Sequence, residues 1–149
     1  YLLEPEVLEM IPPNQKISIE RDIYPKVAGN GLYGFPFEGY FIDSGTPESY
    51  LEANFKSIGN NGTVAHSGAS IRGPSLIHES AELQDCIIGP NAIIGPHVKM
   101  EKCVIRRTVI LSDVKGYGGV IEDCVIGPAI SFEKDLNRTL VSPEGSIQF

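Results

Sequence analysis

The fold is decided by residues 86–96, which read CIIGPNAIIGP. The triplet Ile-Gly-Pro occurs twice in this stretch, beginning at Ile88 and at Ile94, six positions apart. A third copy begins at Ile126, and Ile71 opens a related segment in which one residue separates the isoleucine from Gly-Pro. Self-similarity at a short fixed period is typical of a repeat architecture.

Equivalent positions recur at a constant spacing along this part of the chain. The steps from Ile71 to Ile88 and from Ile88 to Ile105 are both seventeen positions, and within one coil aliphatic residues fall six apart, as at Ile94 and Met100. Three short strands per coil, each pointing one aliphatic side chain at a common axis, account for both spacings. We therefore predict a mainly β structure, a triangular parallel β-helix whose coils stack about 4.8 Å apart.

Cysteine occupies a second recurring position. The step from Cys86 to Cys103 is again seventeen positions, whereas that from Cys103 to Cys124 is longer by four, which we interpret as an insertion. The extra residues fall around 115–119 (KGYGG), where we predict a protruding loop, and the six-position spacing places Leu111 on the axis. The cysteines are expected to form a ladder on one edge. Packing of a small side chain is favoured there over zinc binding by thiolates.

Glycine and the end of the repeat define the corners and the cap. Gly89, Gly95 and Gly127 are expected to permit corner conformations that larger residues resist. Residues 131–149 lose the repeat and are predicted to cap the last coil or to return along the β-helix.

Residues 1–58 lack the repeat and read as a mixed α/β remnant of a larger domain. The motif Gly59-Asn60-Asn61-Gly62 is a linker signal, so we predict two domains, residues 1–58 and residues 63–149. Proline, capping residues and apolar spacing predict helices over residues 4–10, from Ser18 towards Lys26 and from Thr46 to Ser57, with strands at residues 1–3, 32–37 and 39–42.

Composition excludes some classes of function. The net charge is −7 and the basic residues are scattered apart from Arg106-Arg107, so nucleic-acid binding is not expected. The sequence contains no apolar run of about 18 residues, so no membrane partner is expected. Three cysteines without a CxxC pair indicate reduced thiols and a cytoplasmic protein.

Two motifs carry a family resemblance. Residues 18–25 (SIERDIYP) and 39–53 (GYFIDSGTPESYLEA), followed by the hexapeptide repeats, resemble the end of the catalytic domain of sugar-1-phosphate nucleotidylyltransferases. The sequence is most similar to the GDP-mannose pyrophosphorylase-like and microbial glucose-1-phosphate nucleotidylyltransferase branch. The resemblance extends to about residue 130 and implies that the β-helix is left-handed and follows a Rossmann-like domain.

The resemblance implies a magnesium site. In this family the aspartate that corresponds to Asp43 helps to bind catalytic Mg²⁺ beside the phosphates of the NTP and the sugar 1-phosphate. Both reactants are anionic, so a hard cation held by carboxylates has to screen and align them. Gly45 and Thr46 are expected to shape the loop; alternatively, Asp43 merely caps the turn that follows. Glu20 lies in the first motif and Lys26 directly follows it, and neither has an assigned role.

The family's glycine-rich nucleotide loop has no counterpart in this sequence. We therefore expect a fragment of a longer chain that is inactive alone. The sugar stays open between mannose and glucose, and the base between guanine, uracil and thymine.

Two other readings compete. Some β-helices are acyltransferases with a histidine as general base, for which His66, His78 and His97 are candidates, although they do not share one coil register. Alternatively, the β-helix assembles a homo-oligomer or binds a regulator without catalysis, through aliphatic edges at Ile87, Ile93, Val104 and Val125.

Overall fold

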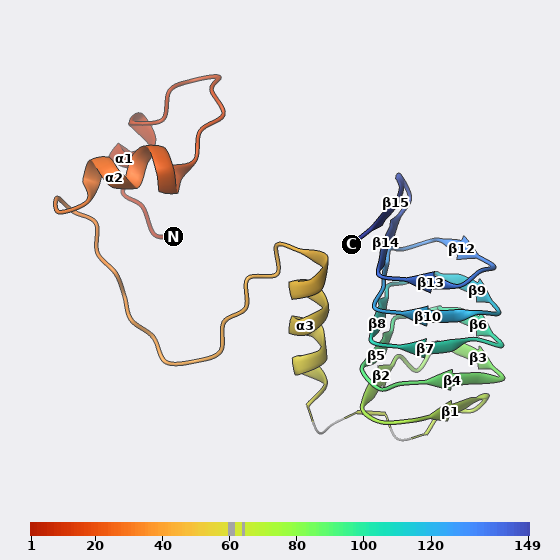
Figure 1. Ribbon diagram of the computed structural model, residues 1–149. Coiled ribbons are helices and arrows are strands. Elements are labelled where there is room, and N and C mark those ends of the chain that lie inside the picture. Colours follow the sequence, from red (N-terminus) through yellow and green to blue (C-terminus); the bar gives the residue numbers. More distant parts are fainter. Residues whose placement is uncertain (60–61, 64) are drawn as a thin grey trace. The chain divides into compact units, whose positions relative to one another are not determined.

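The computed structural model describes residues 1–59, 62–63 and 65–149 (Figure 1). The chain forms two compact units, Tyr1–Tyr40 and Phe41–Phe149, which are described separately below. The predicted linker includes Asn60 and Asn61, which lie outside the described residues. The domain division between residues 58 and 63 stays a prediction.

The first unit is helical and irregular. It contains α1 (Pro5–Glu9), a π-helical turn η1 (Ile19–Ile23) and α2 (Tyr24–Val27). Ser18 is the N-cap of η1, as the sequence predicts, and its side-chain oxygen accepts a hydrogen bond from the backbone N–H of Arg21 at 3.3 Å.

The strands predicted at residues 1–3, 32–37 and 39–42 are wrong. These residues adopt no strand in the structure. A strand is stabilised by pairing and by burial of one face. Tyr33 and Phe35 are 89% and 90% exposed, so neither source of stabilisation is present.

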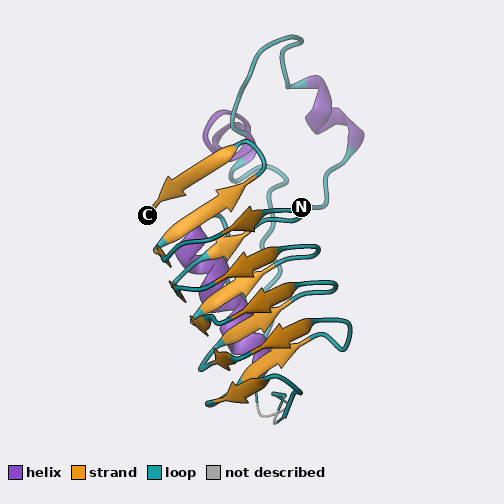
Figure 2. Cartoon of the chain, turned by 90° about the vertical axis from the view of Figure 1, so that its right-hand side faces the viewer, coloured by secondary structure: helices purple, strands orange, loops and turns teal. Residues whose placement is uncertain are grey.

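The second unit begins with α3 (Pro47–Ile58), followed by a three-sided β-helix (Figure 2). Each coil contributes one strand to each of three sheets. Sheet A is formed by β1 (Ala69–Ile71), β4 (Cys86–Ile88), β7 (Val104–Arg106), β10 (Val120–Glu122) and β13 (Leu136–Asn137). Sheet B is formed by β2 (Ser75–Ile77), β5 (Ala92–Ile94), β8 (Thr108–Ile110), β11 (Val125–Ile126), β14 (Thr139–Ser142) and β15 (Gly145–Gln148). Sheet C is formed by β3 (Glu82–Gln84), β6 (Lys99–Glu101), β9 (Lys115–Tyr117) and β12 (Ser131–Phe132).

The predicted stacking of the coils is confirmed. Ile71 pairs with Ile88, Ile88 pairs with Ile105, and Ile105 pairs with Ile121, all in parallel. The side chains of Ile88, Ile105 and Ile121 are fully buried on the axis. The mainly β fold of parallel stacked coils therefore follows from the repeat, because each coil buries its aliphatic residues against the coils above and below.

The third coil is shorter by one position than the repeat predicts, and not longer. Ile94 pairs with Ile110, a step of sixteen positions, so Ile110 lies on the axis and Leu111 is 37% exposed. The predicted loop at residues 115–119 is also wrong, because Lys115–Tyr117 is strand β9.

Gly116 in β9 is required by packing at the axis. A Cβ at this position would lie 2.6 Å from the Met100 Cε atom and 2.7 Å from the Phe132 Cζ atom. These two long side chains fill the space that a side chain at residue 116 would otherwise occupy. The sequence KGYGG therefore resembles a loop in composition but is a strand in structure.

The predicted cysteine ladder is only partly formed. Cys86 and Cys103 precede the paired residues Ile87 and Val104 and so lie on adjacent coils, whereas Cys124 precedes Val125, which pairs with Val109 in sheet B. Cys124 therefore stacks on Thr108, and its backbone N–H donates to the Thr108 Oγ1 atom at 3.2 Å. The prediction fails for Cys124 because the corner before sheet A and the corner before sheet B can both end in cysteine.

Each cysteine follows a residue with positive φ and closes a corner. Its thiol donates to the carbonyl oxygen two residues earlier, at 3.3 Å from Cys86, 3.2 Å from Cys103 and 3.1 Å from Cys124. The Thr108 hydroxyl makes the same bond at 2.9 Å. A hydrogen bond from Cys103 lowers the pKa of the Cys86 thiol, whereas that interaction and burial raise the pKa of Cys103. All three thiols are buried and donate to backbone carbonyl oxygens at their corners.

The corner glycines serve two purposes. Gly89 has a φ of +95°, as expected for a conformation that other residues resist. Gly95 and Gly127 do not have a positive φ; a Cβ there would lie 2.9 Å from the Ile110 carbonyl oxygen and 3.0 Å from that of Val141. These two glycines therefore permit close approach of the next coil.

The end of the chain continues the coil before it returns. Although the sequence repeat is lost after residue 130, β12, β13 and β14 pair in parallel with the preceding coil. Strand β15 then runs back antiparallel to β14, as the predicted return requires. Backbone pairing thus persists for one coil beyond the recognisable hexapeptides.

Candidate functional site

The candidate site is the loop that leads into α3. Asp43 is exposed, and its Oδ1 atom accepts a hydrogen bond from the backbone N–H of Gly45 at 3.1 Å. A Cβ on Gly45 would lie 3.2 Å from the same Oδ1 atom, so glycine lets the turn close tightly. Asp43 therefore caps the turn with one of its carboxylate oxygens, Oδ1, as the alternative interpretation expected.

The loop ends in a capping box. The Thr46 hydroxyl accepts a hydrogen bond from the backbone N–H of Ser49 at 3.2 Å, and the Ser49 hydroxyl oxygen accepts one from the backbone N–H of Thr46 at 3.1 Å. Pro47 and Glu48 occupy the first turn, where fixed φ and negative charge are favourable. Sequence reasoning predicted Thr46 as the cap and missed Ser49, which the reciprocal spacing of a capping box could have identified.

The chemistry of Asp43 fits one ligand of a hard cation. Carboxylate oxygens are the ligands that Mg²⁺ prefers. Within residues 1–59, 62–63 and 65–149, however, no three His, Cys, Asp or Glu side chains converge on one point. Asp43 therefore accounts for one ligand, and the described residues do not form a complete metal site.

Helix α3 is packed against sheet B. Leu51 of α3 is buried together with Val109 of β8 and Val125 of β11. Partly buried hydrophobic residues surround this α3 cluster: Tyr50, Phe55, Ile93, Leu140 and Phe149. Val125 and Ile93, predicted to be exposed edges, thus lie under the chain's own helix. That part of the predicted interface is wrong because α3 already covers these residues.

Polar contacts flank the α3 cluster. The Arg138 Nη2 atom lies 3.8 Å from the Glu48 Oε1 atom. Arg107 lies over the Phe55 ring, 5.6 Å from its centroid, and its Nε donates to the Asp123 Oδ1 atom at 2.7 Å. These groups line a groove of about 310 Å³ between α3 and the β-helix. Arg107, the second residue of the Arg106-Arg107 pair, thus contacts both an aromatic ring and a carboxylate.

Two of the three histidines meet at one corner. The His78 Nδ1 atom lies 2.8 Å from the Ser80 Oγ atom, which also accepts a hydrogen bond from the backbone N–H of His97 at 3.0 Å. His66 instead bonds its Nδ1 to the Ser67 carbonyl oxygen at 2.7 Å. Both His78 and His97 are exposed, and the contacts are those of a corner turn.

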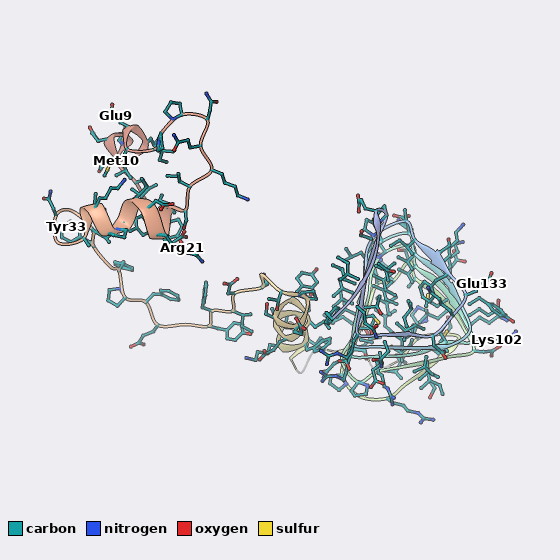
Figure 3. All side chains as sticks on the ribbon, turned by 45° about the horizontal axis from the view of Figure 1, so that its top comes forward. Glu9, Met10, Arg21, Tyr33, Lys102 and Glu133 are labelled. Carbon is teal, nitrogen blue, oxygen red and sulfur yellow. The ribbon has the colours of Figure 1, made fainter. Side chains whose placement is uncertain are left out.

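A larger depression, about 680 Å³, lies over sheet C and takes no residue from the Asp43 loop. On this face Lys99 pairs with Glu82 at 2.7 Å, and Lys102 pairs with Glu101 at 2.9 Å. Figure 3 labels Lys102 and Glu133 at this part of the β-helix. Lys115 and Glu133 also line this depression. The candidate site is placed at the Asp43 loop because the motif residues of the sequence lie there and not in this depression.

Glu20 has a structural role in the first unit. It accepts hydrogen bonds from the Tyr1 hydroxyl at 2.5 Å and from the Ser18 hydroxyl at 2.9 Å. These bonds lower the pKa of the Glu20 carboxyl group, and the bond from Tyr1 has the largest effect. No hydrogen bond or ion pair of the Lys26 side chain is present among the described residues, and its role stays open.

The fold and the loop define a class: a parallel β-helix preceded by a capped helix that carries an Asp-Ser-Gly-Thr-Pro turn. No family model matches the chain. It is 33% identical over 119 residues to probable mannose-1-phosphate guanylyltransferase 1 of Oryza sativa subsp. japonica, covering 72% of this chain and 33% of that protein. It is 28% identical over 133 residues to glucose-1-phosphate adenylyltransferase of Clostridium perfringens, covering 83% of this chain and 33% of that protein.

A mannose-1-phosphate guanylyltransferase of Mycobacterium tuberculosis is 28% identical over 117 residues, covering 70% of this chain and 32% of that protein. The resemblance is therefore confirmed: the chain is related to the sugar-1-phosphate nucleotidylyltransferases. It spans about a third of the length of these relatives. No helix in the described part of the chain is long and apolar enough to cross a bilayer.

Proposed function

We propose that the chain is part of an enzyme that joins a sugar 1-phosphate to a nucleoside triphosphate and releases pyrophosphate. The relatives named above support this proposal, since their names specify nucleotidyl transfer to mannose or glucose 1-phosphate. The observation that assigns a role to one residue is the turn before α3, in which the Gly45 amide donates to Asp43.

In this reaction Asp43 would act as a ligand to Mg²⁺. The bound metal would supply charge screening between the two anionic substrates. Asp43 Oδ1 accepts a hydrogen bond from the Gly45 amide, which orients the carboxylate. The other oxygen, Oδ2, would be the one that binds the metal. The remaining ligands would come from phosphate oxygens, water and groups outside the described residues.

The test is Asp43→Asn in the full-length protein. Loss of a charged ligand is expected to reduce kcat/KM by about 100-fold and to raise the Mg²⁺ concentration required, because substrate alignment is lost. Asp113→Asn is the matched control, since Asp113 is also exposed and lies at a corner of the β-helix, outside the motif that carries Asp43. Equal activity and equal metal dependence of Asp43→Asn and the unmodified protein would exclude this role for Asp43.

Sugar and base are proposed from the relatives. Mannose or glucose 1-phosphate and GTP or ATP are the pairs that their names support. Competition assays with the four combinations would distinguish them. The 149-residue piece alone is proposed to be inactive, because Asp43 by itself cannot hold both substrates. Pyrophosphate release by the purified piece would contradict this.

We also propose that the β-helix assembles with a second copy through sheet A. On sheet B the outward apolar column is covered by α3, whereas on sheet A the equivalent column of Ile87, Val104 and Val120 does not belong to the α3 cluster: Ile87 and Val104 are partly exposed and Val120 is 40% exposed. Val104→Lys should shift light scattering towards the monomer, and Gln84→Lys on sheet C should not. A monomer at all concentrations without substitution would exclude this interface.

The compartment is proposed to be the cytoplasm. Cys86, Cys103 and Cys124 are all free thiols, which is usual in a reducing compartment. Localisation of a tagged full-length protein would test this.

A further inference from the structure

We infer that the β-helix holds Asp43 in place through α3, so that Val109 and Leu51 are positioning residues for the proposed reaction. This inference rests on the proposed function of Asp43. It assigns to the β-helix a contribution to metal affinity that is distinct from assembly.

The first step is local and runs from Asp43 to the first turn of α3. Asp43 Oδ1 accepts from the Gly45 amide, and Thr46 and Ser49 exchange two hydrogen bonds. The backbone N–H of Tyr50 donates to the Thr46 carbonyl oxygen at 2.9 Å, which starts the regular helix. Only Ser44, Gly45 and Thr46 lie between Asp43 and Pro47, the first residue of α3, and hydrogen bonds hold Gly45 and Thr46, so the orientation of α3 restricts the position of the turn.

The second step is the packing of α3 on sheet B. Leu51 is 4% exposed, and it contacts Val109 and Val125, which are 2% and 7% exposed. Val109 pairs with Ile93 on one side and with Val125 on the other, so the helix rests on consecutive coils. Stacked coils give a rigid surface because these strands are hydrogen-bonded on both sides and their side chains are closely packed.

The third step is the contact at the capped end of α3. Glu48 lies in the first turn, and its carboxylate faces Arg138 at 3.8 Å; both side chains are more than half exposed. Such a pair contributes little to stability. Its position links the capped turn to the last coil, so it adds a salt-sensitive restraint on orientation beside the apolar contact.

The experiment compares two introduced aspartates in the full-length protein. Val109→Asp places a charge beneath α3 and should detach the helix without disturbing the axis, because residue 109 points outward from the β-helix. Gln84→Asp introduces the same residue at an exposed outward position on sheet C. Phe55→Ala, at the margin of the α3 cluster, is a second and milder variant.

Mn²⁺ binding by electron paramagnetic resonance, in the absence of turnover, is the principal readout. Val109→Asp should weaken binding by about tenfold, the size of effect typical of groups that orient a metal ligand. Phe55→Ala should weaken it by a smaller factor, and Gln84→Asp should leave it unchanged. Far-ultraviolet circular dichroism should show an intact β-helix in all three.

Two results separate the inference from the proposed function. If Asp43→Asn loses Mn²⁺ while Val109→Asp and Phe55→Ala bind it normally, positioning by the β-helix is wrong and the metal role of Asp43 stands. If Asp43→Asn itself binds Mn²⁺ normally, the proposed function fails first. If Val109→Asp unfolds the β-helix, Phe55→Ala decides, and its unchanged affinity would overturn the inference.

Discussion

The two compact units of this chain use apolar residues in opposite ways. In residues 1–40, all of which the structure describes, Ile23 alone is buried, whereas Tyr33 and Phe35 are almost fully exposed. In the β-helix a continuous core follows the axis from Ala81 to Leu136. The difference shows that hydrophobic content does not create a core unless the chain also supplies a partner for each apolar face.

The repeat provides that partner locally. Each coil stacks on the preceding one, so Ile105 is covered by Ile88 below and by Ile121 above. The aromatic segment at residues 32–37 alternates Tyr33, Phe35 and Phe37 as a strand would, yet no described strand pairs with it. These three side chains are accordingly 89%, 90% and 66% exposed.

Separating the two units should give the largest effect. Residues 41–149 expressed alone should unfold cooperatively, because the core and α3 both lie within them. Residues 1–40 alone should show no cooperative transition, because too little apolar surface is buried to offset the loss of chain entropy. Thermal unfolding followed by circular dichroism distinguishes these outcomes. A cooperative transition of the 1–40 piece would break the comparison.

The sequence predicts that the coils stack better than it predicts the length of each coil. Ile71, Ile88 and Ile105 are placed correctly because side-chain periodicity reports directly on the axis. The third coil is misassigned because Cys103 and Cys124 look equivalent, although they close corners of different edges. At these corners a residue with positive φ is followed by a small side chain that donates a hydrogen bond, and Arg107-Thr108 forms the same corner without cysteine.

A pair of glycines sharpens the comparison at single residues. Gly68 and Gly29 both have a φ of +79°, but a Cβ on Gly68 would lie 1.8 Å from the Leu83 carbonyl oxygen, whereas Gly29 has no atom within 4 Å. Gly68→Ala should lower the free energy of unfolding of the β-helix by more than about 4 kcal/mol.

Gly29→Ala is the matched control and should leave the β-helix transition unchanged, since its strain of about 1 kcal/mol falls in the other unit. Both free energies are measured by urea titration. Equal effects of the two substitutions would show that φ, rather than contact with the next coil, determines the cost.

Core truncation should have the next largest effect. Ile105→Ala removes a fully buried side chain between two coils and should cost about 3 kcal/mol. Val120→Ala, at a 40% exposed position on the outer face, should cost less than about 0.5 kcal/mol. Urea midpoints of the two variants provide the measurement. A cost for Val120→Ala as large as that for Ile105→Ala would contradict an axial core.

Loss of the helix cap should have the smallest effect. Thr46→Ala removes the acceptor for the Ser49 amide and should lower the free energy of unfolding by about 1 kcal/mol. Thr46→Ser keeps the hydroxyl group and should recover most of this loss. Differential scanning calorimetry of residues 41–149 would detect both, and an undiminished Thr46→Ala variant would show that the packing of Leu51 alone fixes α3.

The candidate site is predictable only in part from the sequence. Asp43, Gly45 and Thr46 are found because turn and cap chemistry is local. The packing of α3 over Ile93 and Val125 was missed because outward apolar residues of a strand do not reveal what covers them. Ser49 was missed although its spacing from Thr46 carried the signal.

Native-state hydrogen exchange on the 149-residue chain tests the contrast between the units most directly. The account predicts that the amides of Ile88, Ile105 and Ile121 exchange together, at the free energy of global unfolding, while residues 32–37 exchange at rates close to those of an unfolded peptide. Strong protection of residues 32–37, or independent exchange of the three isoleucines, would contradict it.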